Sequence, residues 1–109
     1  MAYPLETIRK HSTFIMIRKT GKIRKGKNFN VHYLGSQNLN NLIYVGFTAT
    51  KRIGTAVKRN KAKRIMRDLV RKVIAKYGKI NTYYVLIAKS PIFENSFHSQ
   101  ELELIELIA

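Results

Sequence analysis

The sequence is organised around residues 48–77, TATKRIGTAVKRNKAKRIMRDLVRKVIAKY. From Ala56 onward the apolar residues of this stretch recur every three or four positions, at Ala62, Ile65, Met66, Leu69, Val70, Val73, Ile74 and Tyr77. That spacing lines them along one side of a helix. We therefore expect a long amphipathic helix whose apolar side meets a core. Thr55 is the expected N-cap, and Gly54 permits a tight bend before it.

The opposite side of this helix is almost wholly cationic. Its polar and basic residues at helical spacing are Asn60, Lys63 or Arg64, Arg67 and Arg71. Like charges placed three or four residues apart repel one another, so a polyanionic partner that relieves the repulsion is expected. Lys51 and Arg52 precede the helix, where basic residues add to the free N–H groups in attracting phosphate. The alternative is a cationic surface helix that serves solubility alone.

A long, irregularly gapped pattern runs through the same stretch. It reads Lys51-Arg52-Ile53-Gly54-x-Ala56-Val57-x-Arg59-Asn60-x-x-Lys63-Arg64-x-x-Arg67. This pattern resembles the signature of the bacterial ribonuclease P protein subunit. The resemblance extends more weakly over most of the chain. It implies that the helix and the residues before it bind the phosphates and sugars of a catalytic RNA. The candidate RNA-binding residues are Lys51, Arg52, Lys58, Arg59, Asn60, Lys63, Arg64, Arg67 and Arg71.

The resemblance also implies a site for the 5′ leader of precursor tRNA, in a cleft between the first helix and the open sheet face. The matching positions are Phe14, Arg18, His32, Lys51 and Lys89. Arg18 stands where the family commonly has a second aromatic residue, and His32 stands where it usually has tyrosine or phenylalanine. A histidine ring still stacks on a base, although less strongly. From the residues alone a core position is favoured for Phe14, and only the resemblance gives a ligand-facing position equal weight.

Composition limits the possible classes of protein. At 109 residues the chain is expected to form one domain, residues 1–109. Its net charge of +15 points to nucleic acid or an anionic membrane surface. A membrane partner is not expected, because no apolar run approaches about 18 residues and the start lacks a signal-peptide apolar region. With no cysteine, disulfides and thiolate metal sites are excluded, and a cytoplasmic location is expected.

The periodicity predicts an α+β fold, with helices packed on a small, mostly antiparallel sheet. The expected elements are a helix over 5–21, a basic turn or edge strand over 21–27, strands over 28–34 and 42–50, the long helix, an interior strand over 81–88 and a final helix. Ser12 or Thr13 is expected to cap the first helix, and Gly21 to end it. Polar residues 35–41 favour a hairpin loop between the first two main strands.

The two strands over 28–34 and 42–50 are expected to share one apolar face and one open polar face. Gly78 is the expected end of the long helix. The resemblance implies a left-handed strand–helix–strand crossover around that helix, opposite to the general rule.

No catalytic constellation of the protein itself is visible. His11, His32 and His98 are scattered, and the six carboxylates form no pair suited to bind metal or exchange protons. The resemblance implies that the catalytic groups lie on a partner: a catalytic RNA binds the magnesium ions and cuts precursor tRNA, while the protein holds that RNA and the leader. The expected partners are thus the catalytic RNA and precursor tRNA. No cofactor on the protein and no obligatory protein partner are expected.

Two other functions are compatible with the basic composition. A structural RNA-binding protein, such as a small ribosomal protein, has the same charge balance, and only the pattern over 51–67 separates it from a ribonuclease P subunit. A helix that reads the DNA major groove is ranked far behind, because a predicted strand precedes the long helix where a helix and short turn are needed.

Overall fold

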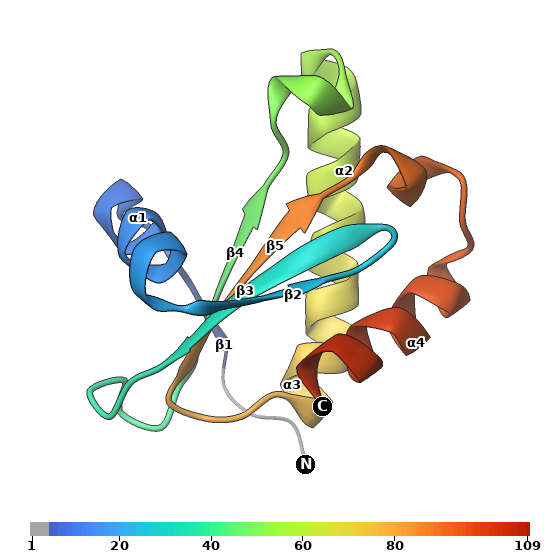
Figure 1. Ribbon diagram of the computed structural model, residues 1–109. Helices are drawn as coiled ribbons and strands as arrows, with labels where there is room; N and C mark the ends of the chain where they lie inside the picture. Colours follow the sequence, from blue (N-terminus) through green and yellow to red (C-terminus); the bar gives the residue numbers. More distant parts are fainter. Residues whose placement is uncertain (1–4) are drawn as a thin grey trace.

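Five strands form one mixed sheet in the computed structural model, which describes residues 5–109 (Figure 1). The strands are β1 (Leu5–Thr7), β2 (Lys22–Lys25), β3 (Phe29–Gly35), β4 (Ile43–Thr48) and β5 (Thr82–Ala88). Their order is β1-β4-β5-β3-β2, which puts the last strand of the sequence at the centre. The pairs β1–β4 and β4–β5 are parallel, and the pairs β3–β5 and β2–β3 are antiparallel. Residues 1–4, at the start of the chain that was examined for a signal peptide, lie outside the described range.

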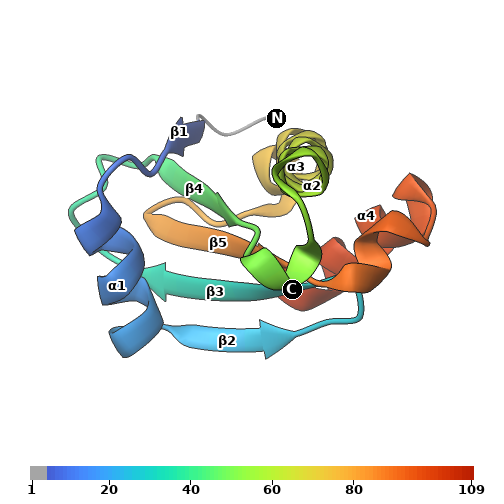
Figure 2. The same cartoon turned by 90° about the horizontal axis from the view of Figure 1, so that it is seen from above.

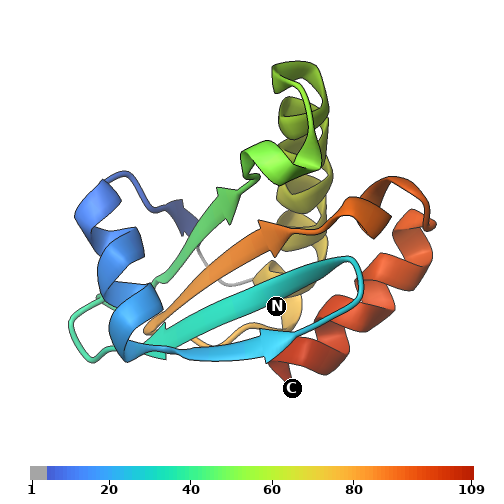
Figure 3. The same cartoon turned by 45° about the horizontal axis from the view of Figure 1, so that its top comes forward.

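Helices cover both faces of the sheet (Figures 2 and 3). α2 (Ala56–Leu69), α3 (Ala75–Tyr77) and α4 (Phe97–Ile108) lie on one side, and α1 (His11–Thr20) lies on the other. The main core fills the space under α2 and α4. Among the described residues it contains seventeen buried side chains, whereas the cluster under α1 has three: Ile8, Ile17 and Val85. The predicted α+β class is confirmed.

Strand alternation assigns side chains to these two faces as predicted. Phe29 and Val31 of β3 are buried in the main core, whereas the next residue along the strand, His32, points to the α1 side. β5 is apolar on both faces because it is the central strand. Its Leu86 belongs to the main core, and its neighbour Val85 belongs to the cluster under α1.

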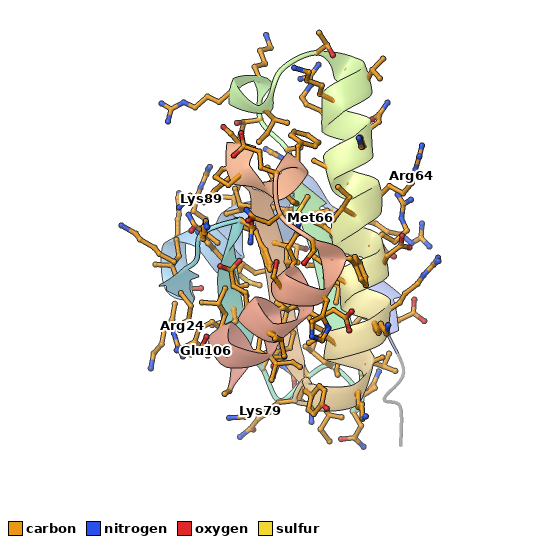
Figure 4. All side chains as sticks on the ribbon, turned by 90° about the vertical axis from the view of Figure 1, so that its right-hand side faces the viewer. Arg24, Arg64, Met66, Lys79, Lys89 and Glu106 are labelled. Carbon is orange, nitrogen blue, oxygen red and sulfur yellow. The ribbon has the colours of Figure 1, made fainter. Side chains whose placement is uncertain are left out.

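The start of α2 has the predicted geometry. The Thr55 side-chain oxygen accepts a hydrogen bond from the Lys58 N–H at 3.3 Å, as an N-cap does. Gly54 has φ of +131°, a conformation that residues with a side chain rarely adopt. Behind this cap, the apolar side of α2 faces the core: Met66 points inward with 0% exposure, while Arg64 points away from the protein (Figure 4).

The end of the long helix contains one unpredicted feature. Residues Val70–Ile74 form a π-helical turn between α2 and α3, which keeps Val70, Val73 and Ile74 buried. The helix ends before Gly78, as predicted, and the Gly78 N–H donates to the Ile74 carbonyl at 2.9 Å. Tyr77 was expected on the core stripe but is 49% exposed, and the next residue, Gly78, is buried against Ile74 and Ile43 instead.

The connection from β4 through α2 and α3 to β5 is a left-handed crossover. Both strands point the same way, and the helix lies on one face of the sheet (Figure 1). Seen from the helix side with the strands pointing up, β5 lies to the left of β4 (Figures 1 and 2). This hand is the opposite of that found in nearly all such units. The expectation drawn from the resemblance is therefore confirmed.

The predicted helix over 5–21 was wrong at its amino-terminal end. Leu5–Thr7 form β1, and the Ile8 N–H still donates to the Val45 carbonyl at 2.8 Å. The helix therefore begins only at His11, with Lys10 at the N-cap and no side-chain cap, so Ser12 and Thr13 lie inside it. Three residues carry too little periodicity to reveal a strand, and the partner that holds β1 is distant in the sequence.

The predicted hairpin over 35–41 was also wrong, because β5 lies between β3 and β4. Asn81, just before β5, holds the loop: its carbonyl accepts from the Ser36 N–H at 2.8 Å, and its side chain accepts from the Asn41 N–H at 2.9 Å. Inserting β5 and adding β1 make two of the four strand pairs parallel, so the sheet is less antiparallel than expected. The basic segment after α1 is the edge strand β2, one of its two predicted forms.

Candidate nucleic-acid interface

The outer side of α2 carries most of the candidate RNA-binding residues. The exposed members of this set are Lys51, Arg52, Lys58, Asn60, Arg64, Arg67 and Arg71, and the partly buried members are Arg59 and Lys63. The inner side of the same helix holds Ala62, Met66 and Leu69 in the core. Because burial fixes the rotation of the helix, the cationic side must face solvent. We call this surface the α2 cationic face.

The recorded ion pairs do not involve this surface, although the exposed Asp68 lies on the same helix and Glu6 lines a pocket with Arg67 and Arg71. Within residues 5–109 the structure records a single ion pair, between Lys72 and Glu101 at 3.6 Å, and neither residue belongs to the α2 cationic face. The carboxylate of Glu103 is occupied elsewhere, since it accepts from the N–H groups of Lys27 and Asn28 at 2.9 and 3.1 Å. The cations of the α2 cationic face outnumber these acids, so its net positive charge is available to an external anion.

The segment before α2 adds further cations near the helix N-terminus. Lys51–Ile53 form a short 3₁₀ turn, with Ile53 buried and both Lys51 and Arg52 exposed. Gly54 then turns the chain into the capped helix, and Lys58 folds over that turn. Helix N-termini attract anions through free N–H groups and the helix dipole. This end of the α2 cationic face is thus well suited to phosphate.

A groove of about 370 Å³ lies on the other side of the sheet, along α1. We call it the α1 groove. Three of the predicted leader-binding residues line it: Phe14 and Arg18 from α1 and His32 from β3. Lys63 of α2 lines its far wall, so the groove adjoins the α2 cationic face. The remaining lining residues are His11, Ile15, Ile17, Phe47, Thr48, Ala49, Val85 and Ile87.

Phe14 has both of the roles that the sequence left open. Its half-buried ring packs against the cluster under α1 and also lines the groove. The ring lies directly on the backbone of Gly46: a Cβ atom there would be 2.6 Å from Phe14 Cε1. Gly46 is therefore required for this close approach. Packing fixes one edge of the ring, and the rest of the ring lines the groove.

His32 lies partly buried in the α1 groove, facing the positive charge of Arg18. Burial lowers the pKa of the imidazole below its ordinary value, and the nearby Arg18 guanidinium lowers it further. At neutral pH the ring is therefore uncharged. A neutral imidazole presents a flat π face together with one donor and one acceptor nitrogen. Such a group can stack on a base, while Arg18 supplies the charge for a phosphate.

The structure places the other two predicted leader residues outside this groove. Lys51 lies on the exposed turn before α2. Lys89 follows β5, and its Nζ donates to the Gly26 carbonyl at 2.7 Å, which ties the side chain to the β2–β3 turn. Neither residue lines the α1 groove.

Sequence reasoning missed several residues that line the α1 groove. His11 lies three and seven positions before Phe14 and Arg18, so helical spacing could have placed it on the same side of α1. Thr48 lies in the strand predicted over 42–50, for which an open polar face was expected, but it was not among the predicted site residues. Lys63 was predicted only for the α2 cationic face, because nothing in the sequence shows that α2 reaches the groove.

Metal clusters and membrane-spanning helices are not found within residues 5–109. No group of three or more histidine, cysteine, aspartate or glutamate side chains in this range could hold a metal ion. No helix in the same range has both the length and the apolar character needed to cross a membrane.

The fold and these surfaces define a class: a small α+β protein with a cationic helix face beside an aromatic-lined groove, the kind of surface that suits RNA. Comparison with known proteins narrows that class. A family model described as Ribonuclease P matches residues 4–109. The chain belongs to the ribonuclease P protein family.

Individual relatives agree with this assignment. A ribonuclease P protein component from Caulobacter vibrioides is 36% identical over 84 residues, which cover 77% of this chain and 56% of the relative. The chain thus spans little more than half of that protein's length. A ribonuclease P protein component from Listeria monocytogenes is 29% identical over 101 residues, which cover 93% of this chain and 83% of the relative.

Solved structures show the same fold. The RNase P protein from Thermotoga maritima is 26% identical, with a TM-score of 0.80 and 94% of each chain covered. The Staphylococcus aureus RNase P protein, at 24% identity, has a TM-score of 0.76 over 98% of this chain and 93% of that one.

Proposed function

We propose that this protein is the protein subunit of ribonuclease P. In this role it binds the catalytic RNA and the 5′ leader of precursor tRNA, and it promotes the endonucleolytic cut that leaves the mature tRNA 5′ end. The observation that carries the proposal is the position of the α1 groove, which gathers Phe14, Arg18 and His32 next to the α2 cationic face. One molecule thereby offers two adjoining surfaces for two RNA segments.

The α2 cationic face suits the catalytic RNA. Its exposed arginines, Arg64, Arg67 and Arg71, project from successive turns of one helix. A guanidinium group donates two parallel hydrogen bonds to phosphate, and a row of them follows a sugar–phosphate backbone. This kind of contact positions an RNA without reading its sequence.

The α1 groove suits the leader because a leader is single-stranded. Its bases are free to leave the stack and lie on a protein ring. Phe14 and His32 provide two rings from different elements, and Arg18 lies beside them as a phosphate partner. Mature tRNA has no leader, so this groove distinguishes substrate from product.

We assign the cleavage chemistry and its magnesium ions to the partner RNA. In the family that the chain resembles, the catalytic RNA holds these ions. The protein's contribution is to bind and orient the two RNAs, with no cofactor of its own. On this proposal the protein works in the cytoplasm with the catalytic RNA and precursor tRNA as partners, and it requires no other protein.

Reconstitution tests the proposal. The full chain, freed of nucleic acid, is mixed with a ribonuclease P RNA and precursor tRNA at low magnesium concentration. We expect site-specific cleavage by the mixture, little cleavage by the RNA alone and none by the protein alone. If the protein bound RNA but did not stimulate cleavage, the proposal would be wrong and a structural RNA-binding role would be favoured.

A further inference from the structure

A second groove, of about 400 Å³, lies along the opposite side of α1 from the α1 groove. We call it the tyrosine groove, because Tyr44 and Tyr83 form its floor. The two rings stand on neighbouring parallel strands at paired positions. Their centroids are 5.7 Å apart with the planes tilted by 43°, and both side chains are only partly buried. The sheet therefore presents a two-ring aromatic platform outside the site described above.

Apart from Ile8 and Leu39, the residues around the two tyrosines are polar, and two of them are basic. Arg9 and Lys10, both exposed, lie where the chain enters α1, and the loop residue Asn38 also lines the groove. Glu6 is the one acidic residue among those that line the groove. Aromatic rings flanked by cations are the combination by which proteins bind single-stranded nucleic acid, with bases on the rings and phosphates on the cations. A duplex keeps its bases stacked inside and cannot use such rings.

The two grooves share one wall. α1 lies across the sheet between them, and the buried residues Ile8, Ile17 and Val85 form the ridge below it. The α1 groove is the one that adjoins Lys63 and the α2 cationic face. A strand that leaves the α1 groove away from α2 reaches the tyrosine groove after crossing one helix, about 10 Å wide.

We propose that the tyrosine groove binds a second segment of the leader, the nucleotides farther from the cleavage site, by stacking bases on Tyr44 and Tyr83. This inference rests on the proposed function. The direction follows from the geometry: the nucleotides nearest the cut belong beside the α2 cationic face, where the catalytic RNA binds, and the tyrosine groove is on the far side of α1.

The test compares leader lengths. Holoenzyme is reconstituted with the full chain, and its affinity is measured for mature tRNA and for precursors with leaders of about 4 and about 16 nucleotides, the range of site sizes of single-strand-binding domains. The main variant carries Tyr44→Leu and Tyr83→Leu, which keep apolar bulk on the sheet. We expect about tenfold weaker binding of the long-leader precursor. Binding of the short-leader precursor and of mature tRNA should be unchanged.

Three control variants separate stacking from other effects. Tyr44→Phe with Tyr83→Phe keeps the rings and should retain long-leader affinity. Tyr77→Leu removes an exposed tyrosine at the end of α3, away from both grooves, and should change nothing. Arg9→Gln with Lys10→Gln leaves the core intact and should weaken only long-leader binding, with a smaller dependence on salt. This last variant decides the question if the leucine variant fails to fold.

Two outcomes overturn the inference while leaving the proposed function intact. One is unchanged long-leader affinity in both the leucine and the glutamine variants. The other is an equal loss for long and short leaders, which would place a different RNA segment in the tyrosine groove. Failure of the proposed function is distinguishable: wild-type holoenzyme would then bind precursor and mature tRNA equally well.

Discussion

The two faces of the sheet are built from the same strands but are used differently. Under α2 and α4, a continuous core buries Phe29, Leu86 and Met66 completely. Under α1, a small cluster leaves grooves on both sides of the helix, and half-buried rings line them. A short helix laid across a wide sheet cannot cover it. The comparison teaches that one face of the sheet is sealed by a continuous core, whereas the other leaves partly exposed rings in grooves beside α1.

The largest expected effect is on stability, and two neighbouring residues of β5 that point to opposite faces of the sheet test it. Leu86 is fully buried in the main core, whereas Ile87 faces the α1 groove and is only partly buried. Leu86→Ala should lower the free energy of unfolding by about 2–5 kcal/mol. Ile87→Ala should cost less, because part of its surface is already in water. Urea unfolding measures both, and equal losses would show that the two faces contribute alike.

The next effect concerns the α2 cationic face, which contributes charge and little packing. Replacing Arg64, Arg67 and Arg71 together by alanine should weaken binding of the catalytic RNA and reduce the salt slope by roughly 0.7–0.9 for each phosphate that is no longer neutralised. Lys76→Ala, on the last turn of the same helix, is the matched control, since its Nζ lies over the Tyr77 ring. Thermal melting should be unchanged. A triple variant with wild-type affinity and slope would show that this face is not an RNA surface.

A smaller, substrate-specific effect is expected in the α1 groove. Stacking on a single-stranded base contributes about 1–3 kcal/mol, so Phe14→Ala should weaken precursor binding by roughly ten- to hundredfold and leave mature tRNA binding unchanged. Because Phe14 also packs on Gly46, its thermal stability must be measured first. Arg18→Ala is the cleaner probe, since Arg18 is exposed. Equal losses with precursor and mature tRNA would place the leader elsewhere.

The smallest effect is the pH dependence contributed by His32. Its pKa in the folded protein lies below the ordinary value of 6.5, mainly through burial. The unfolded chain therefore takes up a proton first as the pH falls, so the stability that neutral His32 contributes is complete above about 6.5 and is lost as pH drops towards the folded pKa. Arg18→Ala should raise this pKa, because the second cause is the charge of Arg18. NMR titration of the imidazole measures it, and an unchanged or lower pKa would contradict the account.

Periodic segments of the sequence predicted their structure well. The stripe from Ala62 to Ile74, the cap at Thr55 and the alternation of β3 and β4 all rest on local spacing, and the structure confirms them. β1 and the position of β5 depend on pairing between distant segments, which spacing does not encode. The supposed hairpin over 35–41 was wrong for that reason.

The candidate site was predictable only in part. The α2 cationic face could be predicted from the sequence. Its basic residues alternate with an apolar stripe, and burial of that stripe in the core turns the basic residues to solvent. Only the resemblance indicated that His32 lies with Phe14 and Arg18 in the α1 groove, since His32 comes from β3 and the other two come from α1. No local signal could show that Lys89 donates to the Gly26 carbonyl or that Lys63 reaches the groove.

The central claim is that the α2 cationic face and the α1 groove bind two different RNA segments, and one crossed measurement tests it most directly. The Arg64, Arg67 and Arg71 triple alanine variant and Arg18→Ala are each measured for affinity to the catalytic RNA, and each reconstituted holoenzyme is measured for the ratio of precursor to mature tRNA binding. The account predicts that the triple variant loses affinity for the catalytic RNA with an unchanged ratio, and that Arg18→Ala keeps that affinity while the ratio falls. If both variants changed the same quantity, a single RNA surface would explain the data and the claim would be contradicted.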